Sequence, residues 1–596
     1  MTLPMTEKYT PIVSVVSAIS KGAIAQILEI LNMARSSLLR LLRKAYRLHY
    51  VSRKTGIPAD ELMDQAKEKA QNRGISRRRM LQGSLAIATA MVTSTAWPRS
   101  SRPVIAQQMR PVLIVGAGMA GLMAAYRLHE AGVPVEIMEA RSRIGGRMYS
   151  RRQALGSEAS MEIGGEWIDT NHVAIRSLAE ELELELVDLF EVEAGLTPQT
   201  YFFGGRKVSE EEVLRDFAPI AAQIEADLAT IEDFEDYTTP IPAAVALDQI
   251  SLADYVDSIE ASEMIRNLLK VSYTTFVGLP AEEQSCLNLL YVVSTDLDEL
   301  ALYGESDERF YTRGGNDQMP RMIADRLHNF IQTDTILESL RQRPDGWYQA
   351  SMRSGLRTWQ RSYERVVLTV PFSVLRDVEL NIPLPEAKRL AINELGYGTN
   401  NKLVTAYEEK IWRDRYQATG LTFSDLPYQE TREASSTRFT PGPSFLVHYM
   451  GGRLGVDFER LTTPEAVNRV LPQFERVFPG LRQVHIPGKT ARTAWVGDPF
   501  SRGSYSCYKV GQITQMYGVE GERVGNLFFA GEHTSLEFQG YMEGACETGE
   551  AAALAIIEDL GLLEEAARLR QRRSHQLAAR TYPRRAQYPF RRRAIV

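Results

Sequence analysis

The stretch "VGAGMAG", Val115–Gly121, decides the fold of this chain. Residues 112–115 are apolar and mostly β-branched, which is typical of a buried parallel strand that ends at the first glycine. Residues 122–130 then follow helical spacing, and residues 134–138 read as a second strand. A strand, a glycine-rich turn, a helix and a second strand in this order predict the unit that binds a dinucleotide.

The glycines and the acid of this unit each have a physical role. Gly116 permits the tight turn, Gly118 lets the backbone approach a pyrophosphate, and Gly121 lets the helix pack closely on the strand. The helix N-terminus faces the anion. Glu139 ends the second strand, where an acid accepts hydrogen bonds from ribose hydroxyls. The residues of this unit expected to contact the dinucleotide are Gly116, Gly118, Met119, Ala120, Gly121 and Glu139. The motif alone does not separate NAD from FAD.

Three further segments distinguish an FAD-binding chain from an NAD-binding one. "ARSRIGGRMYS" begins at Ala140, and "MEIGGEWID" spans Met161–Asp169. Near the other end of the chain, "NLFFAGEHTSLEFQGYMEGA" begins at Asn526. This order resembles the flavin amine oxidases, the family of monoamine, polyamine and L-amino-acid oxidases, and the resemblance covers roughly residues 111–560. It implies an α/β fold in which a discontinuous, Rossmann-like FAD-binding domain carries an inserted α+β substrate domain, as in monoamine oxidases.

The resemblance also assigns residues to the cofactor. The acid of A-G-E, Glu532, would bind the ribityl chain of the flavin, and the helix opened by Tyr541 and Met542 would lie beneath the flavin ring. A backbone group near Leu340 would contact the adenine end. The FAD contacts implied beyond the first unit are Ala140, Arg141, Gly146, Arg147, Gly164, Gly165, Glu166, Trp167, Leu340, Gly531, Glu532, Tyr541 and Met542.

Three residues are implied to be catalytic. Lys402, in "LGYGTNNKLVTAYEE", matches the family lysine that holds a water against the reactive flavin nitrogen, whereas the plainer interpretation is a surface lysine at a strand edge. Tyr505 and Tyr541 match the pair of aromatic walls that face the flavin, and ordinary core packing is the alternative for each.

The cofactor is expected to be bound without a covalent bond. Monoamine oxidases carry G-C-Y where this chain has Gly503-Ser504-Tyr505, and serine cannot form their thioether. Cys507 lies three residues after Ser504 and is expected to face elsewhere.

The substrate is less sharply defined. L-amino-acid oxidases often place a carboxylate-binding arginine where this chain has Trp167. Asp169 falls where some polyamine oxidases have an acid that meets a cationic nitrogen, which suits a basic amine or a basic amino acid. Alternatively, Asp169 caps a helix near Asn171, and an arginine elsewhere could still hold a carboxylate.

These observations predict an FAD-dependent oxidoreductase. It would oxidise a primary amine or an L-amino acid to the imine, which water converts to an aldehyde or keto acid and ammonia, while dioxygen is reduced to hydrogen peroxide. The alternatives are a flavin desaturase of the carotenoid or protoporphyrinogen-oxidase kind, and a flavin-binding subunit without turnover. No metal is expected. The net charge of −6, with 24% charged residues, gives no reason to expect nucleic acid. The expected partners are the small substrate, dioxygen, a second copy of the chain in a homodimer and, through the basic termini, a membrane surface.

The domain boundaries follow from the motifs. The FAD-binding domain is expected to comprise residues 107–183, 307–370 and 486–562. The substrate-binding domain is expected to comprise residues 184–306 and 371–485. Residues 1–106 form an N-terminal extension, and residues 563–596 form a basic tail whose composition predicts disorder.

The N-terminal extension resembles an export signal. "SRRRML", Ser76–Leu81, precedes a modest apolar run to Ala96 and the small-residue pattern "VIA" at residues 104–106. This resembles a twin-arginine signal, which exports folded, cofactor-loaded proteins. The alternative is a basic cap before a core helix, which would leave the protein in the cytoplasm. Residues 24–46 have the spacing of a membrane-surface helix, unless translation starts later, at Met63.

Overall fold

The computed structural model describes residues 109–152, 160–298, 300–440 and 442–578. The twin-arginine segment, the helical pattern of residues 24–46 and the basic tail beyond residue 578 therefore lie outside the described residues. Within the described part of the chain, no helix combines the length and the apolar character that crossing a membrane requires.

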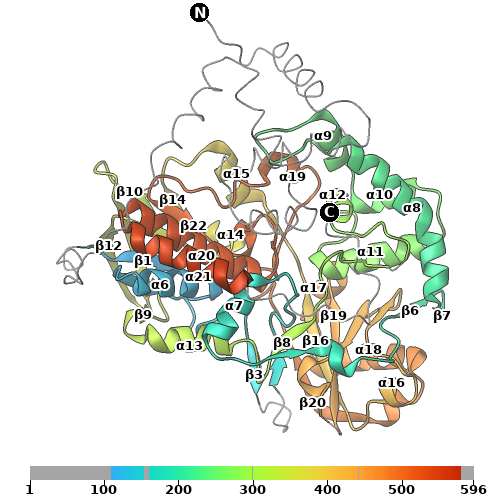
Figure 1. The fold of residues 1–596 in the computed structure, drawn as a ribbon. Helices are drawn as coiled ribbons and strands as arrows, with labels where there is room; N and C mark the ends of the chain where they lie inside the picture. The colour runs from blue at the N-terminus through green and yellow to red at the C-terminus, as the bar shows by residue number, and fades with distance from the viewer. Residues whose placement is uncertain (1–108, 153–159, 299, 441, 579–596) are drawn as a thin grey trace, which may run out of the picture. The chain divides into compact units, whose positions relative to one another are not determined.

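A five-stranded parallel sheet is built around the glycine-rich turn (Figure 1). Its strands, in spatial order, are β22 (Leu527–Phe529), β13 (Val366–Leu368), β1 (Val112–Val115), β2 (Val135–Met138) and β9 (Ile331–Gln332). Val115 at the end of β1 pairs with Leu368 on one side and Met138 on the other. Strands from distant parts of the sequence thus end side by side at the turn, which confirms the predicted α/β fold.

The two faces of this sheet pack against different layers. Ile114, Val367 and Phe528 point into a core shared with helices α6 (Met119–Glu130) and α20 (Met542–Asp559). The alternate residues of the strands face a second core that includes residues of a four-stranded mixed sheet, in which an antiparallel hairpin meander is joined by one parallel edge strand. This second sheet has the order β12 (Arg357–Tyr363), β11 (Tyr348–Ser354), β10 (Ile336–Gln342) and β14 (Glu379–Asn381).

A seven-stranded sheet forms the centre of the substrate half. Its strands, in spatial order, are β20 (His485–Arg492), β16 (Asn401–Tyr407), β19 (Ser444–Met450), β18 (Glu430–Glu433), β17 (Thr422–Ser424), β6 (Thr200–Phe203) and β7 (Arg206–Val208). Leu403, Leu446 and Met450 face a core that includes helices α17 (Gly452–Arg460) and α18 (Thr463–Val477). Val404 and Val447, on the opposite face, pack against Met161 and Ile163 of the segment expected beside the flavin.

The remaining elements connect these sheets. The helices of the first insert are α8 (Glu210–Thr230), α9 (Pro242–Asp248), α10 (Leu252–Ser258), α11 (Glu263–Val277) and α12 (Leu287–Leu290). The short strands are β3 (Ser150–Arg152), β4 (Ser160–Glu162), β5 (Leu186–Asp188), β8 (Phe310–Thr312), β15 (Gly396–Tyr397) and β21 (Ser506–Cys507). The other helices are α7 (Val173–Glu181), α13 (Gln318–Arg326), α14 (Phe372–Leu375), α15 (Glu386–Glu394), α16 (Ile411–Asp414), α19 (Ile513–Met516) and α21 (Leu563–Ala578). Single 3₁₀ turns are η3 (Leu189–Val192), η4 (His328–Phe330), η5 (Ser435–Thr437), η6 (Leu481–Gln483) and η7 (Glu532–Thr534).

Strand pairing shifts two of the expected domain boundaries. Strand β14, expected in the substrate domain, pairs with β10 of the hairpin sheet. Strand β20, expected in the FAD-binding domain from residue 486, pairs with β16 of the seven-stranded sheet. In both places a short edge strand joins a sheet by backbone pairing, which no side-chain motif in the sequence specifies.

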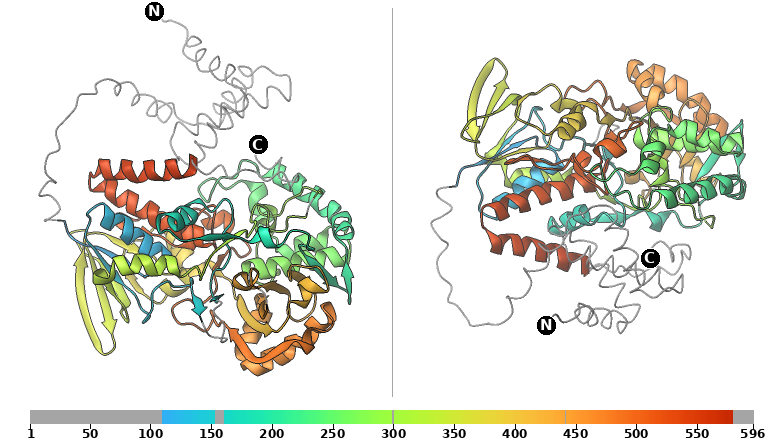
Figure 2. Two further views of the ribbon diagram at one scale, coloured as in Figure 1. Left: turned by 60° about the horizontal axis from the view of Figure 1, so that its bottom comes forward. Right: turned by 90° about the horizontal axis from the view of Figure 1, so that it is seen from above.

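The prediction of disorder from residue 563 onward is wrong for the first part of that tail. Residues 563–578 form helix α21, which in Figure 2 lies beside α20, both drawn in red. Glu564 and Glu565 occupy its first turn, where acids favour a helix. Ala566 and Leu569 are buried in the core that contains α6 and α20, so packing outweighs the polar composition.

Candidate active site

One cavity of about 820 Å³ extends from the glycine-rich turn to the seven-stranded sheet. Most of the predicted site residues line it. These are Gly116, Gly118, Met119, Ala120, Glu139, Ala140, Arg141, Gly146, Arg147, Gly164, Gly165, Glu166, Trp167, Asp169, Lys402, Tyr505, Gly531, Glu532, Tyr541 and Met542. Gly121 and Leu340 do not line it.

The nucleotide end of the cavity has free backbone donors. Helix α6 begins after Gly118 with no side-chain cap and no acid in its first turn, so its N-terminal N–H groups remain for an anion. Gly116 has φ +107°, and a Cβ there would lie 2.6 Å from Thr369 Oγ1. Gly121 lies behind the turn, where a Cβ would come within 2.0 Å of the Gly116 carbonyl oxygen. This close approach is the helix–strand packing that the sequence predicted for Gly121.

Glu139 stands at the end of β2, as the sequence predicted. Its two carboxylate oxygens accept hydrogen bonds from the backbone N–H groups of Ala117 and Arg141, each at 2.8 Å. Burial raises the pKa of Glu139, and these two donors act against that rise. The carboxylate therefore ties the glycine turn to the segment after β2, and it lines the space where a ribose would lie.

Arg147 and Glu532 come from opposite ends of the fold and meet in the cavity. Arg147 Nη1 donates to Glu532 Oε1 and to the Ser504 carbonyl, both at 2.8 Å. Glu532 Oε2 accepts from Ser506 Oγ at 2.7 Å and from Gly540 N–H at 2.9 Å. Burial alone would raise the pKa of Glu532, but Arg147 and the other donors lower it overall. The structure thus holds an ionised carboxylate between the two halves of the predicted flavin site.

Leu340 requires a correction. It is fully buried in the core, whereas Ile336, Leu337 and Glu338 line the cavity. The residues of β10 that reach the cavity therefore lie two to four positions before Leu340, at the start of the strand.

Lys402, Tyr449 and Glu430 form one row across three strands. Strand register pairs Lys402 on β16 with Tyr449 on β19, and Tyr449 with Glu430 on β18. Directly opposed residues in a sheet project from the same face. All three line the cavity, so this row forms the sheet's contribution to the site.

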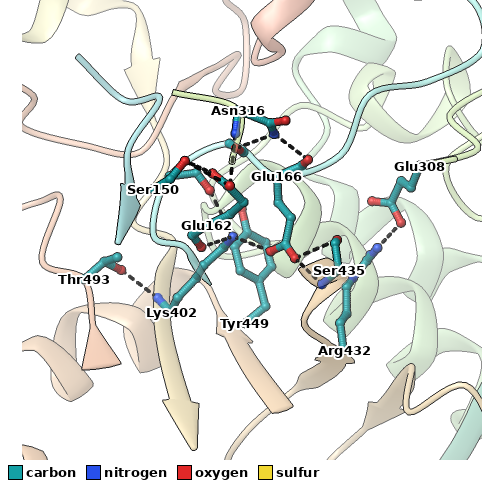
Figure 3. A network of polar contacts seen from close by, with 12 residues as sticks. Ser150, Glu162, Glu166, Glu308, Asn316, Lys402, Arg432, Ser435, Tyr449 and Thr493 are labelled. Carbon is teal, nitrogen blue, oxygen red and sulfur yellow. Dashed lines mark hydrogen bonds and ion pairs between the residues drawn. The ribbon is translucent and has the colours of Figure 1, made fainter. Parts of the chain in front are cut away.

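Lys402 is buried, which excludes the alternative of a surface lysine (Figure 3). Its Nζ donates to the Glu162 carbonyl at 3.0 Å, the Gly164 carbonyl at 2.9 Å and Glu166 Oε2 at 2.9 Å. An ammonium has three donors, so each has a protein acceptor. Any water held by Lys402 must therefore share or replace one of these acceptors.

Two acids near Lys402, Glu166 and Glu162, have pKa values shifted in opposite directions. Burial would raise the pKa of Glu166, but Lys402 and two hydrogen bonds from Ser435 lower it overall. Burial, together with the charge of Glu166, raises the pKa of Glu162 to about 8. The pair therefore holds one carboxylate and one carboxyl group that is mostly protonated at neutral pH.

Tyr505 and Tyr541 both line the cavity as neutral phenols, because burial raises the pKa of each. The Tyr505 hydroxyl donates to the Phe276 carbonyl at 2.6 Å and lies 2.9 Å from the Tyr449 hydroxyl. The Tyr541 ring lies 5.0 Å from that of His172, whose pKa burial lowers to about 3. Tyr505 is thus held by hydrogen-bond partners on two other elements, and Tyr541 packs against His172 with Asp169 close enough for its charge to raise the pKa of the phenol further.

None of the chain's three cysteines lines the cavity. Ser504 does, and its hydroxyl donates to Asn400 Oδ1 at 2.7 Å. Cys507 is buried on the short strand β21.

The far end of the cavity carries charged groups that the sequence did not single out. Glu308, Glu430 and Arg432 line it together with Asp169, whose Oδ1 accepts the Glu308 N–H at 2.7 Å. The guanidinium of Arg432 lies 4.4 Å from the Trp167 ring centre. An arginine from another strand thus contacts the position where the sequence lacks one. Only the alternation of charges in "ETRE", residues 430–433, hinted at this face.

The alternative role for Asp169, as a helix cap, is not favoured. Helix α7 begins at Val173, and the backbone N–H groups of Ala174 and Ile175 are bonded by the Glu543 carboxylate at 2.7 and 2.8 Å.

Comparison with known proteins agrees with this geometry. The model of the family described as flavin containing amine oxidoreductase matches residues 119–557. Flavin-containing amine oxidase B of Canis lupus familiaris is 26% identical over 475 residues, which cover 76% of this chain and 87% of the relative. Lysine-specific histone demethylase 1 homolog 2 of Oryza sativa subsp. japonica is 26% identical over 78% of this chain and 59% of its own length.

Two solved structures share the fold. A putrescine oxidase structure with putrescine bound covers 76% of this chain and 99% of its own, with TM-score 0.63 and 21% identity. A cyclohexylamine oxidase from Brevibacterium oxydans has TM-score 0.65 and 22% identity.

Proposed function

The chain belongs to the flavin containing amine oxidoreductase family, and from this premise we propose that it binds FAD without a covalent bond and oxidises a primary amine or an L-amino acid. It is a flavin-dependent amine oxidase by family. The proposal adds the form of the cofactor, the hydrolysis of the imine to an aldehyde or keto acid and ammonia, and the reduction of dioxygen to hydrogen peroxide.

The residues present fit FAD. The uncapped N-terminus of α6 suits a pyrophosphate, and Glu139 lies where a ribose would be. At Gly165, a Cβ would lie 2.8 Å from Met542 Sδ, so the G-G segment packs directly against the first residue of α20, and both residues line the cavity. Ser504 in place of cysteine supports a cofactor that can be released intact.

The bound flavin would supply the redox chemistry, taking a hydride equivalent from the carbon next to the amine and passing electrons to dioxygen. The chain's own groups prepare the substrate. Tyr505 and Tyr541 offer neutral aromatic faces that orient an amine. Burial of the substrate between Tyr505 and Tyr541 disfavours the ammonium form, so we expect the substrate nitrogen to react as the neutral amine. Lys402 is held by three acceptors at the floor of the site. One N–H of its ammonium can also donate a hydrogen bond to a water.

The observation that carries this proposal is the meeting of distant segments around one cavity. Arg147 of the first nucleotide segment contacts Glu532 of the last one, and Lys402 of the insert reaches the Glu162–Glu166 segment between them. Charged groups and phenols around a buried cavity are costly to a core that only supports the fold. This lining is therefore typical of a site that binds a ligand.

The test is a peroxide assay on purified protein. The flavin is first released with acid and identified as FAD, and the holoprotein is then screened against amines and L-amino acids with coupled detection of hydrogen peroxide. We expect releasable FAD and peroxide from at least one compound. A flavin that stays attached contradicts non-covalent binding. A flavin reduced by no amine, but by a polyene or a porphyrinogen, favours a desaturase, and one reduced by nothing favours a subunit without turnover.

We further propose that the protein is exported through its paired arginines, Arg77 and Arg78. Replacing both with lysine should leave the protein in the cytoplasm with its FAD, because the twin-arginine route reads this pair. Export that persists in the variant would contradict the proposal.

A further inference from the structure

Arg432 stands out among the charged groups of the cavity. It lies on β18, is only 5% exposed, and lines the cavity two residues from Glu430. Residues two apart on a strand share a face, so Arg432 belongs to the same face as the row of Lys402, Tyr449 and Glu430. Figure 3 shows its guanidinium directed toward Glu308.

The guanidinium of Arg432 is held by two carboxylates, but not all of its N–H donors are used. Its Nε donates to Glu430 Oε1 and its Nη1 donates to Glu308 Oε2. A guanidinium carries five N–H donors in a planar fork. In the part of the chain that the structure describes, these two bonds are the only ones that Arg432 donates, so three donors remain for a ligand.

Trp167 makes this fork rigid. The guanidinium lies 4.4 Å from the indole centre, and Lys402 Nζ lies 5.2 Å from the same ring. Stacking on a ring covers one face of the guanidinium and leaves its edge available for hydrogen bonds. The indole is therefore within cation–π distance of both Lys402 and Arg432.

The chemistry that fits such a group is a carboxylate. A buried, stacked arginine with free donors binds the two oxygens of a carboxylate in parallel, which a neutral or cationic group cannot match. A cationic group would have to compete with Arg432 for Glu308 and Glu430. Glu430 is further engaged, because its Oε2 accepts from Thr275 Oγ1 at 2.8 Å and from the Tyr303 hydroxyl at 3.2 Å.

We propose that Arg432 binds the carboxylate of the substrate, so that the amine oxidised at this site is the amine of an amino acid. This inference rests on the proposed amine oxidation, and it assigns the substrate class to an arginine on β18. Glu308 and Glu430 act as positioning residues, because each fixes one nitrogen of the guanidinium.

Binding tests the carboxylate site without turnover. Benzoate and benzamide have the same shape but differ in charge, and each is titrated into the FAD-loaded protein by calorimetry. We expect benzoate to bind about 10–100-fold more tightly, as a charge-assisted pair requires. Arg432→Met should remove this preference, and Arg432→Lys should keep only part of it. Arg313→Met is the matched control, since Arg313 is half exposed, pairs with Glu185 and lies outside the cavity.

Matched substrates test the inference in the wild-type protein, where folding of a variant is not in question. The pairs are L-leucine and 3-methylbutylamine, L-phenylalanine and phenethylamine, L-arginine and agmatine, and L-lysine and cadaverine. We expect the amino acid of a reactive pair to reduce the flavin at least about 100-fold more efficiently than its amine, because the carboxylate adds charge-assisted bonds and fixes the reacting carbon.

The outcomes separate the two proposals. Equal or faster reduction by the decarboxylated amines overturns the inference about Arg432 and leaves amine oxidation intact. Equal binding of benzoate and benzamide overturns it as well. Tight, Arg432-dependent benzoate binding with no reduction by any amine or amino acid supports the carboxylate site and overturns the proposed function.

Discussion

Replacing Lys402 with methionine should destabilise the protein strongly, because it leaves Glu166 as a buried charge without its cation. The Lys402 and Glu166 side chains are 6% and 1% exposed, and their ion pair spans 2.9 Å. Breaking a buried ion pair from one side costs about 3–5 kcal/mol. The carbonyls of Glu162 and Gly164 also lose their Lys402 donor, and a buried group left unsatisfied costs about 1–3 kcal/mol. We therefore expect the free energy of unfolding to fall by at least about 4 kcal/mol at pH 8.

The double variant isolates the charge. Glu166→Gln keeps the shape and can still accept from Ser435, but it carries no charge. In Lys402→Met/Glu166→Gln the uncompensated carboxylate is absent, so the loss should be smaller than the sum of the single losses by about 2–3 kcal/mol. Urea unfolding of the four apoproteins, followed by circular dichroism, gives the cycle without the added stability that bound FAD confers.

The pH dependence gives this prediction a second readout. In the wild type the folded pKa of Glu166 is lowered, so its contribution is present above the unfolded pKa and is lost as pH falls through the folded value. In Lys402→Met, burial acts on Glu166 without a nearby cation and raises the pKa of Glu166. The contribution of Glu166 to stability is then present at low pH and is lost as pH rises. The difference in free energy of unfolding between the wild type and Lys402→Met should therefore increase from pH 5 to pH 8. A loss below 1 kcal/mol, additive effects in the double variant, or a gap independent of pH would refute the reasoning.

Three further substitutions test other parts of the site. Gly116→Ala should lower the free energy of unfolding by about 1–3 kcal/mol and abolish FAD retention, because Gly116 has a positive φ and a Cβ there would meet Thr369. Gly132 also has a positive φ, but a Cβ there would meet no atom within 4 Å, so Gly132→Ala should retain FAD. Equal FAD content of the two variants in a flavin-content assay would contradict the crowding argument. Glu532→Gln should weaken FAD binding about 10–100-fold through the loss of charge-assisted hydrogen bonds, measured by flavin fluorescence on release, and an unchanged dissociation constant would remove Glu532 from the cofactor site. Tyr541→Ala should lower kcat/KM about 10–100-fold by misplacing the substrate while FAD content stays near the wild-type value, and parallel loss of both would show a structural role.

The sequence was sufficient where a local motif fixes the chemistry. The G-x-G-x-x-G turn predicts its own strand, helix and acid, because these parts follow one another within about 30 residues of sequence and Gly121 packs on Gly116 of the same turn. Glu532 could be placed because it follows a buried strand and precedes the helix of Tyr541. Glu532 was assigned through the resemblance of its A-G-E segment to the flavin amine oxidases, whereas its contact with Arg147, 385 residues away, became visible only in the structure.

The sequence was insufficient where a side chain depends on pairing between distant strands. Tyr449, Glu430 and Arg432 reach the cavity only because β16, β19 and β18 align in one register, which no local pattern specifies. Leu340 lies two residues beyond Glu338, the last residue of β10 that lines the cavity, and no local pattern in the sequence marks where the strand leaves the cavity. Helix α21 was missed because two buried side chains in a polar segment give little periodic signal.

Anaerobic mixing shows whether the distant segments close around one flavin that an amine can reduce. The FAD-loaded protein is mixed without oxygen with saturating L-amino acids and amines, and the flavin absorbance is followed; air is then admitted. We expect bleaching by at least one compound, recovery of the flavin absorbance in air, and one hydrogen peroxide for each flavin reoxidised. A flavin that no amine or amino acid bleaches would contradict it.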